Sequence, residues 1–216
     1  QGRINDIREC IGCNICTAGD NTKVPMRCTQ NPTVGEEWRR GWHPETLHPL
    51  ENPEPHLIVG GGPAGLETAR VLTARGAEVT LADARETFGG RVTLESQLPG
   101  LVEWARVRDW RLGQLNDKPN AQLYAQSPLS AADILDYGIP NVVLATGANW
   151  RVDCYGKTHK KPLPFLQNGT VISPDTLMQS GPDSLPDGPI VVFDDERYYL
   201  GGVLAEQIVK SGRKVL

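Results

Sequence analysis

The pattern of apolar and polar residues after the first quarter of the chain predicts a strand, a helix and a second strand. A short apolar run at 57–59 predicts the first strand, and apolar residues at helical spacing follow across 66–75. Gly76 stands where a glycine commonly ends a helix, and residues 78–83 then alternate as a strand does. Two strands joined by a helix form a parallel βαβ unit, and its crossover is almost always right-handed.

Further elements complete this first unit. Residues 101–115 predict a helix, residues 122–125 a strand and residues 141–144 a buried strand. The stretch 130–133, Ser-Ala-Ala-Asp, resembles a capped helix start. Over 101–115 we expect one apolar side and one solvated side: Val102, Ala105 and Leu112 on the first, and Arg106, Arg108 and Arg111 on the second.

A segment rich in proline and glycine, residues 162–188, separates this unit from a second one. Residues 189–193 predict a strand, and residues 202–210 predict a helix that Gly212 is placed to cap. The closing residues 214–216 read as the start of another strand. Because the chain also opens on glutamine rather than methionine, we expect it to be a piece of a longer polypeptide.

The N-terminal part lacks this periodicity. Residues 1–35 hold four cysteines among Gly, Asn, Thr and Pro, as expected where metal bonds rather than a core order a loop. Prolines interrupt residues 38–54, which therefore predict an irregular connector.

Composition and charge narrow the class of protein. The chain is 39% hydrophobic and 22% charged, which is ordinary for a globular protein with a buried core. Its net charge of -4 argues against a nucleic-acid partner, since binding to phosphate backbones needs clustered Lys and Arg. The sequence has neither a run of about eighteen apolar residues nor a signal peptide, so we expect no membrane contact and a reducing, cytoplasmic setting.

Four cysteines carry the strongest chemical signal. Cys10, Cys13, Cys16 and Cys28 follow the spacing Cys-x2-Cys-x2-Cys-x11-Cys, which gathers soft thiolates in one loop and favours a [4Fe-4S] cluster. Zinc is the weaker alternative because its sites more often use two separated pairs, and disulfides fit a reducing setting poorly. Cys154 lies far from the group and is interpreted as a packed or surface thiol.

A glycine fingerprint carries the second signal. Gly60-x-Gly62-x-x-Gly65 lies between the predicted strand and helix, and Asp83 ends the next strand eighteen residues later. These glycines allow a tight turn, close approach of a pyrophosphate and close packing of helix on strand. Asp83 is expected to bind ribose hydroxyls, which favours FAD, ADP or NAD over NADP, although Arg85 weakens that distinction. Gly89, Gly90 and Arg91 form either a second phosphate contact or a structural turn.

The second unit lacks this fingerprint. Its strand is followed by Asp194, Asp195 and Glu196, and three carboxylates would repel a pyrophosphate. We therefore expect no dinucleotide there, which removes the obvious entry point for NAD(P)H.

Taken together, these residues resemble the C-terminal part of the iron-sulfur flavoprotein family that includes trimethylamine, dimethylamine and histamine dehydrogenases and 2,4-dienoyl-CoA reductase. The resemblance covers nearly the whole chain. It rests on the cysteine run 10–16, on residues 28–32, on the stretch 35–45, on the glycine fingerprint and on Ala145-Thr146-Gly147. The stretch 35–45 is especially similar to the amine dehydrogenase branch.

The resemblance implies cofactors and a domain order. Family members carry an N-terminal TIM barrel with FMN, and that barrel is absent from this sequence. The four cysteines of the run would hold a [4Fe-4S] cluster that exchanges electrons with the FMN, and the fingerprint would hold ADP, as in the amine dehydrogenases, or FAD, as in the reductases. The nucleotide site so predicted comprises Gly60, Gly62, Ala64, Gly65, Asp83, Gly90, Arg91, Thr146 and Gly147.

The predicted architecture is therefore α/β. Residues 1–54 form an iron-sulfur segment and connector, residues 55–160 a Rossmann-like adenine-nucleotide domain, and residues 161–216 a linker and an incomplete second Rossmann-like unit.

The predicted function is the electron-transfer portion of an amine dehydrogenase or demethylase. A small amine would reduce FMN, and the electrons would leave through the cluster to an acceptor such as an electron-transferring flavoprotein. One alternative is a fragment of an NAD(P)H-dependent enoate or 2,4-dienoyl-CoA reductase, and another is a standalone electron-transfer module. A homodimer is left open.

Overall fold

The computed structural model describes every residue except 1, 22, 38–45 and 163–169. Part of the predicted connector and part of the predicted linker therefore lie outside the described residues. The chain forms two compact units, one made of residues 1–93 and 103–147, the other of residues 94–102 and 148–216. The first unit contains the cysteine segment and most of the predicted nucleotide domain, whereas residues 94–102 and 148–160 of that domain belong to the second unit. The three-part division drawn from the sequence stays a prediction.

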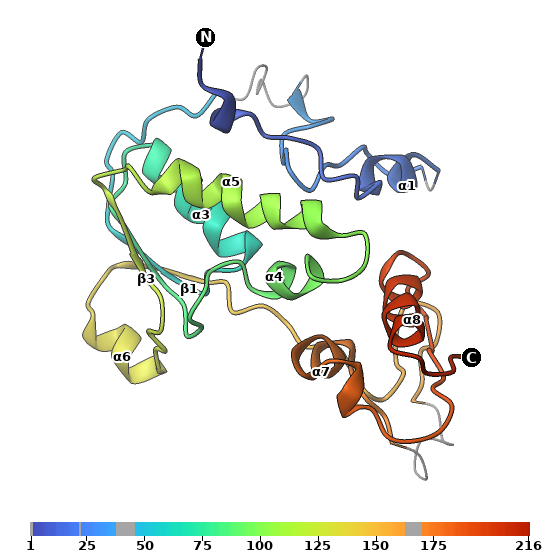
Figure 1. The fold of residues 1–216 in the computed structure, drawn as a ribbon. Coiled ribbons are helices and arrows are strands. Elements are labelled where there is room, and N and C mark those ends of the chain that lie inside the picture. Colours follow the sequence, from blue (N-terminus) through green and yellow to red (C-terminus); the bar gives the residue numbers. More distant parts are fainter. Residues whose placement is uncertain (1, 22, 38–45, 163–169) are drawn as a thin grey trace. The chain divides into compact units, whose positions relative to one another are not determined.

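A four-stranded parallel sheet organises the first unit (Figure 1). Its strands are β1 (His56–Val59), β2 (Val79–Ala82), β3 (Ala121–Tyr124) and β4 (Asn141–Leu144), in the order β3-β2-β1-β4. Each pair of neighbouring strands is in register over four residues; for example, Ile58 pairs with Leu81 in β2 and with Val143 in β4. The sheet confirms the α/β, Rossmann-like class predicted from the pattern of strands and helices.

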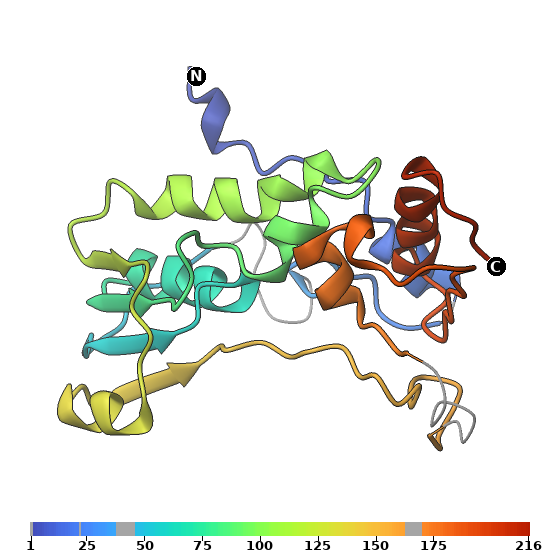
Figure 2. The same cartoon turned by 60° about the horizontal axis from the view of Figure 1, so that its bottom comes forward.

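Two helices cover this sheet on one side. Helix α3 (Pro63–Ala74) packs on β1 and β2, and α5 (Arg106–Leu115) runs alongside α3 (Figure 2). Helix α3 begins earlier than the apolar spacing predicted, because Pro63 is well suited to a first helical position. It ends as predicted: Gly76 has φ +95° and donates its N–H to Thr73 O at 3.0 Å.

The core of the first unit lies between these helices and the sheet. Ile58, Leu66 and Leu81 are completely buried, and Leu115 of α5 is 1% exposed. The apolar residues therefore face inward from β1, β2, α3 and α5, so the turn between β1 and α3 is fixed by packing on both sides.

The remaining elements of the first unit are short. They are η1 (Ile4–Asp6), α1 (Ile15–Asn21), α4 (Arg91–Glu95), η2 (Val102–Ala105) and α6 (Ala131–Asp136). Along the chain, α4 and η2 each include residues of both units. The predicted helix start at Ser130 is confirmed, because Ser130 and Asp133 form a reciprocal capping box.

Two details predicted for the helix and the last strand of the first unit are wrong. Residues 101–115 form a 3-10 turn and a helix rather than one helix, and their faces differ from those expected: Arg111 is 3% exposed, whereas Val102 is 70% exposed. Strand β4 exists but is not buried, since Val142 is 40% and Leu144 69% exposed at the edge of the sheet. Local pattern cannot tell an edge strand from a central one.

The second unit has its own small core. Helix α7 (Pro174–Ser180), the 3-10 turn η4 (Pro182–Ser184) and helix α8 (Leu200–Lys210) enclose it, and Leu177, Leu204 and Ile208 are buried there. The strand predicted at 189–193 is reduced to an isolated parallel bridge between Ile190 and Val215, with Val192 N–H donating to Leu216 O at 3.0 Å. The predicted cap is present, because Gly212 has φ +83° and donates to Val209 O. Among the described helices of either unit, none is long and apolar enough to cross a membrane.

Candidate functional site

The turn between β1 and α3 requires glycine at two of the fingerprint positions. Gly60 has φ +105°, and a Cβ there would lie 2.3 Å from the carbonyl oxygen of Ala145. A Cβ on Gly65 would lie 1.8 Å from the carbonyl oxygen of Gly60. The first glycine therefore lets the chain turn against the end of β4, and the last lets α3 approach the turn closely, as the fingerprint predicts.

The helix start that follows has bare amides. Gly62 is the N-cap of α3 and has no side chain to cap it, so the N–H groups of the first turn, including those of Ala64 and Gly65, have no acceptor within the helix. A helix N-terminus also carries a partial positive charge. This arrangement suits a pyrophosphate, which supplies several oxygen acceptors and negative charge.

Asp83 lies directly beside this turn. Its carboxylate accepts the N–H of Gly61 at 2.6 Å and the N–H of Arg85 at 2.7 Å, and its side chain is 7% exposed. Because a carboxylate can accept about four hydrogen bonds, it retains acceptor capacity for a ribose hydroxyl. The structure thus gives Asp83 a second task, holding the glycine turn, that its spacing alone did not predict.

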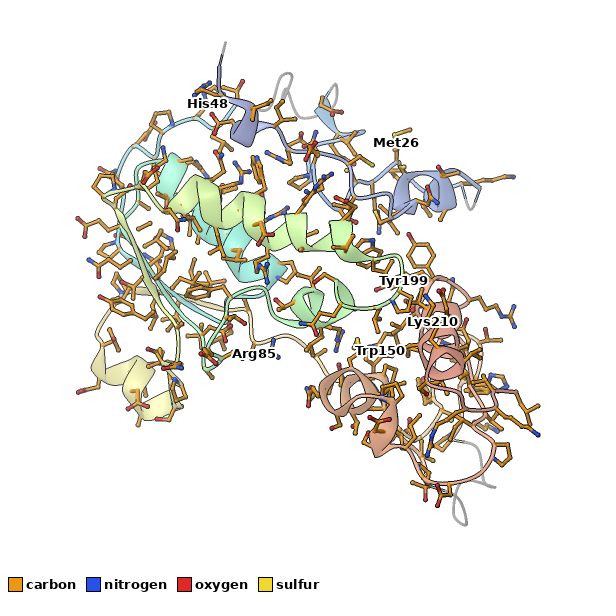
Figure 3. All side chains as sticks on the ribbon, in the orientation of Figure 1. Met26, His48, Arg85, Trp150, Tyr199 and Lys210 are labelled. Atoms are coloured by element: carbon orange, nitrogen blue, oxygen red, sulfur yellow. The ribbon has the colours of Figure 1, made fainter. Side chains whose placement is uncertain are left out.

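A second loop packs on the glycine turn. Gly89 donates its N–H to Gly61 O at 2.7 Å, and a Cβ on Gly90 would lie 3.0 Å from the Cα of Gly62. Arg91 begins helix α4 immediately after this loop. Arg85 (Figure 3) lies on the loop that follows β2, and a Cβ on Gly90 would lie 3.4 Å from its Nη1. The loop therefore shapes the turn, and a phosphate contact from Gly90 and Arg91 stays a prediction.

The end of β4 closes the other side of the turn. Ala145 N–H donates to Val59 O at 2.8 Å, which holds Ala145 beside β1 and Gly60. Thr146 and Gly147 follow it, and Gly147 has φ +80°. At the C-terminal ends of β1 and β2, the structure thus gathers six of the predicted residues: Gly60, Gly62, Ala64, Gly65, Asp83 and Gly90. Thr146 and Gly147 follow the C-terminal end of the neighbouring strand, β4.

The cysteine segment offers soft ligands with suitable hydrogen bonds. All five cysteines are free thiols. Gly12 N–H donates to Cys10 Sγ at 3.4 Å, and Asn31 N–H donates to Cys28 Sγ at 3.3 Å. Cys13 Sγ lies 3.2 Å from the hydroxyl of Thr29. Hydrogen bonds to the sulfurs are among the features that tune iron-sulfur clusters, so the donor set fits such a cluster.

The same cysteines do not form a compact site for a single metal ion. Among the described residues, no three His, Cys, Asp or Glu side chains lie close enough to one another to bind the same metal ion. The cluster is therefore a proposal that depends on the chemistry and spacing of the four thiols.

A buried ion pair beside this segment was missed by the sequence reasoning. Arg111 of α5 donates from Nε to the carboxylate of Glu67 in α3 at 2.7 Å. Burial alone would raise the pKa of the Glu67 carboxyl, but the hydrogen bond from Arg70 and the charges of Arg70, Arg111 and Arg8 lower it. A signal was available: Val107, Arg111 and Leu115 are four residues apart and share one buried helix face.

The turn of the second unit already uses its own carboxylates. Asp194 Oδ1 accepts the N–H groups of Glu196 and Arg197, at 3.1 and 2.9 Å. Asp195 accepts the N–H of Thr158 at 2.6 Å and pairs with His159 Nδ1 at 2.8 Å, which with its backbone hydrogen bonds lowers the pKa of the Asp195 carboxyl to about 2. A carboxylate therefore lies beside the start of α8, where a Cβ on Gly201 would be 2.8 Å from Asp194 Oδ2, and its charge would disfavour a phosphate.

Comparison with known proteins relates the chain to flavin-dependent oxidoreductases. A family model described as an NAD(P)-binding Rossmann-like domain matches residues 58–110. Dimethylamine dehydrogenase of Hyphomicrobium sp. is 41% identical over the whole of this chain, and the chain spans 30% of that relative's length. NADH oxidase of Thermoanaerobacter brockii is 32% identical over 68% of the chain and 22% of the relative.

Solved structures give the same picture. Histamine dehydrogenase from Rhizobium sp. 4-9 is 48% identical with a TM-score of 0.88, over 99% of this chain and 31% of that chain. The 6-hydroxypseudooxynicotine amine oxidase of Pseudomonas geniculata N1 is 44% identical with a TM-score of 0.90, over 98% of this chain and 31% of its own.

Proposed function

The chain belongs to the trimethylamine and dimethylamine dehydrogenase-like family, and from that premise we propose that it is the electron-transfer portion of an amine dehydrogenase or demethylase. The complete protein would oxidise a small amine with FMN bound in an N-terminal barrel. It would then give the electrons to an external acceptor such as an electron-transferring flavoprotein. The proposal includes a cytoplasmic location and leaves a homodimer open.

Two cofactor sites on this chain follow from the proposal. Cys10, Cys13, Cys16 and Cys28 would hold a [4Fe-4S] cluster, which accepts and gives single electrons when bound. The N–H groups of Gly12 and Asn31 would stabilise negative charge on two of the sulfurs. The first turn of α3 would bind the pyrophosphate of ADP or FAD, and Asp83 would accept a ribose hydroxyl.

The acidic turn of the second unit is the observation that favours the dehydrogenase direction. A reductase of this family would draw electrons from NAD(P)H at its second nucleotide-binding unit, the position that the incomplete second Rossmann-like unit predicted within residues 161–216 would hold. In its turn, Asp194 accepts the N–H groups of Glu196 and Arg197, and Asp195 accepts those of Thr158 and His159 from an earlier segment. A phosphate at the start of α8 would lie beside the charge of Asp194, which is unfavourable.

The test is to identify which compounds donate electrons to the flavin of the complete protein. We expect small secondary amines or histamine to reduce the flavin in stopped-flow absorbance, and NADH and NADPH to leave it oxidised. The alternative, suggested by relatives named NADH oxidase and alkene reductase/demethylase, is a reductase. Rapid flavin reduction by NAD(P)H without any response to amines would overturn the proposed function.

A further inference from the structure

One buried arginine joins the cysteine segment to the nucleotide domain. Besides its bond to Glu67, Arg111 donates from Nη1 to Gln30 Oε1 at 3.0 Å and to Val107 O at 2.9 Å. Its Nη2 lies 3.4 Å from the carbonyl oxygens of Thr29 and Gln30. Figure 1 shows the N-terminal segment, in blue, running beside α5. A single guanidinium thus holds the two residues that follow Cys28 against α5 and α3.

Gln30 extends this contact to the other end of the cysteine motif. Its side chain is 2% exposed, and its Nε2 donates to the carbonyl oxygen of Glu9 at 3.2 Å. Glu9 directly precedes Cys10, whereas Gln30 comes two residues after Cys28. The amide of Gln30 therefore spans the motif, with its nitrogen bound beside the first cysteine and its oxygen bound to Arg111.

Thr29 connects the same group to a third cysteine. Its carbonyl oxygen faces Arg111 Nη2, and its hydroxyl lies 3.2 Å from Cys13 Sγ. Contacts from this one network therefore reach the neighbourhood of Cys10, Cys13 and Cys28.

We propose that Arg111, acting through Gln30, is a positioning residue for the iron-sulfur cluster, which it anchors to helices α3 and α5. The inference rests on the proposed function, because it requires the cluster. A buried ion pair is weak evidence for stability in itself, since desolvation offsets the attraction between the charges. The distinguishing feature here is the set of acceptors: Arg111 donates three of its hydrogen bonds to Thr29 and Gln30, the two residues that follow Cys28.

The guanidinium also acts on the cluster through its charge. A nearby positive charge favours the reduced form of a cluster, which carries one more electron. Replacing Arg111 with a neutral residue should therefore lower the reduction potential. Replacing Gln30 with Met should leave the potential nearly unchanged, because no charge is lost.

The experiment compares three variants of the complete protein, purified without air. Arg111→Met and Gln30→Met remove the anchor in two ways, and the second keeps the Arg111–Glu67 pair in place should the first fail to fold. Arg106→Met is the matched control: this partly buried arginine of the same helix also contacts the cysteine segment, through the carboxylate of Glu9, and pairs with Glu103, but makes no bond to residues 29 or 30 in the described structure. Iron loss to a chelator, bound nucleotide and the reduction potential are measured.

We expect Arg111→Met and Gln30→Met to lose iron roughly tenfold faster than the wild type, as is typical when a residue that supports metal ligands is removed. Bound nucleotide should be unchanged, and the potential should fall in Arg111→Met. Iron loss at the wild-type rate in both variants, or equally fast loss in Arg106→Met, would overturn the positioning role. A wild-type protein without iron and sulfide would instead overturn the proposed cluster and, with it, this inference.

Discussion

At the scale of single residues, the side-chain chemistry of the cysteines and of Asp83 predicts their ligands, and the fold provides their hydrogen-bond partners. The spacing of Cys10, Cys13, Cys16 and Cys28 by itself indicates a soft metal centre. The fold adds the N–H and hydroxyl groups that contact three of the sulfurs. Asp83 similarly has a predicted ligand, ribose, and an observed partner, the N–H of Gly61.

The cysteine assignment leads to a spectroscopic prediction. Replacing Cys13 with Ser should abolish the broad visible absorbance of a [4Fe-4S] cluster, because a neutral hydroxyl is a much poorer ligand for iron than a thiolate. Cys154→Ser is the control, since burial and the charges of Asp153 and Asp195 raise the pKa of the Cys154 thiol and disfavour its thiolate. Full iron and sulfide content in Cys13→Ser would contradict the ligand assignment.

At the scale of elements, the turn between β1 and α3 depends on contacts that only glycine permits. A Cβ at Gly65 would meet the backbone of Gly60, which cannot move away as a flexible side chain could. The helix would have to shift away from the strand, and the amides proposed to bind phosphate would shift with it.

Gly65→Ala should therefore destabilise the protein by about 1–3 kcal/mol, the usual range for an overpacked site. It should also weaken ADP binding. Gly113→Ala is the matched control, because Gly113 lies in helix α5 with nothing within 4 Å of an added Cβ; it should stabilise the protein by up to about 1 kcal/mol. Denaturant unfolding and calorimetric titration with ADP provide the two measurements. Equal stability of the two variants would show that the close contact at Gly65 is unimportant.

At the scale of the whole molecule, each unit has a separate core. Ile58, Leu66 and Leu81 belong to the core of the first, and Leu177, Leu204 and Ile208 to that of the second. A ligand that binds only one unit should therefore stabilise that unit selectively.

Adding ADP to nucleotide-free protein should slow amide hydrogen exchange in α3, at whose first turn the pyrophosphate is proposed to bind. Exchange in α8 should remain the same, because the carboxylate of Asp194 lies beside the start of that helix and its charge disfavours a phosphate there. At a hundredfold excess over the dissociation constant, the added stability is about 2.7 kcal/mol. Equal protection of α8 would indicate either a second nucleotide site or coupling between the units.

The sequence alone was sufficient for elements defined by local rules. Apolar period, Gly76, the Ser130–Asp133 pair and the glycine fingerprint placed the βαβ unit and the helix ends, because strands, caps and tight turns depend on residues close together in the chain. The thiol spacing indicated a cluster for the same reason.

Only the tertiary structure decided which faces of the strands and helices are buried. It put β4 at the edge of the sheet with Leu144 exposed, and it buried Arg111 against Glu67 and Gln30, residues 44 and 81 positions away in the chain. A charged side chain is expected at the surface unless a partner offsets its desolvation, and that partner came from a distant segment. The sequence thus determined which groups are proposed to bind a cluster and a nucleotide, whereas folding determined how the segment that carries the cysteines is attached to the nucleotide domain.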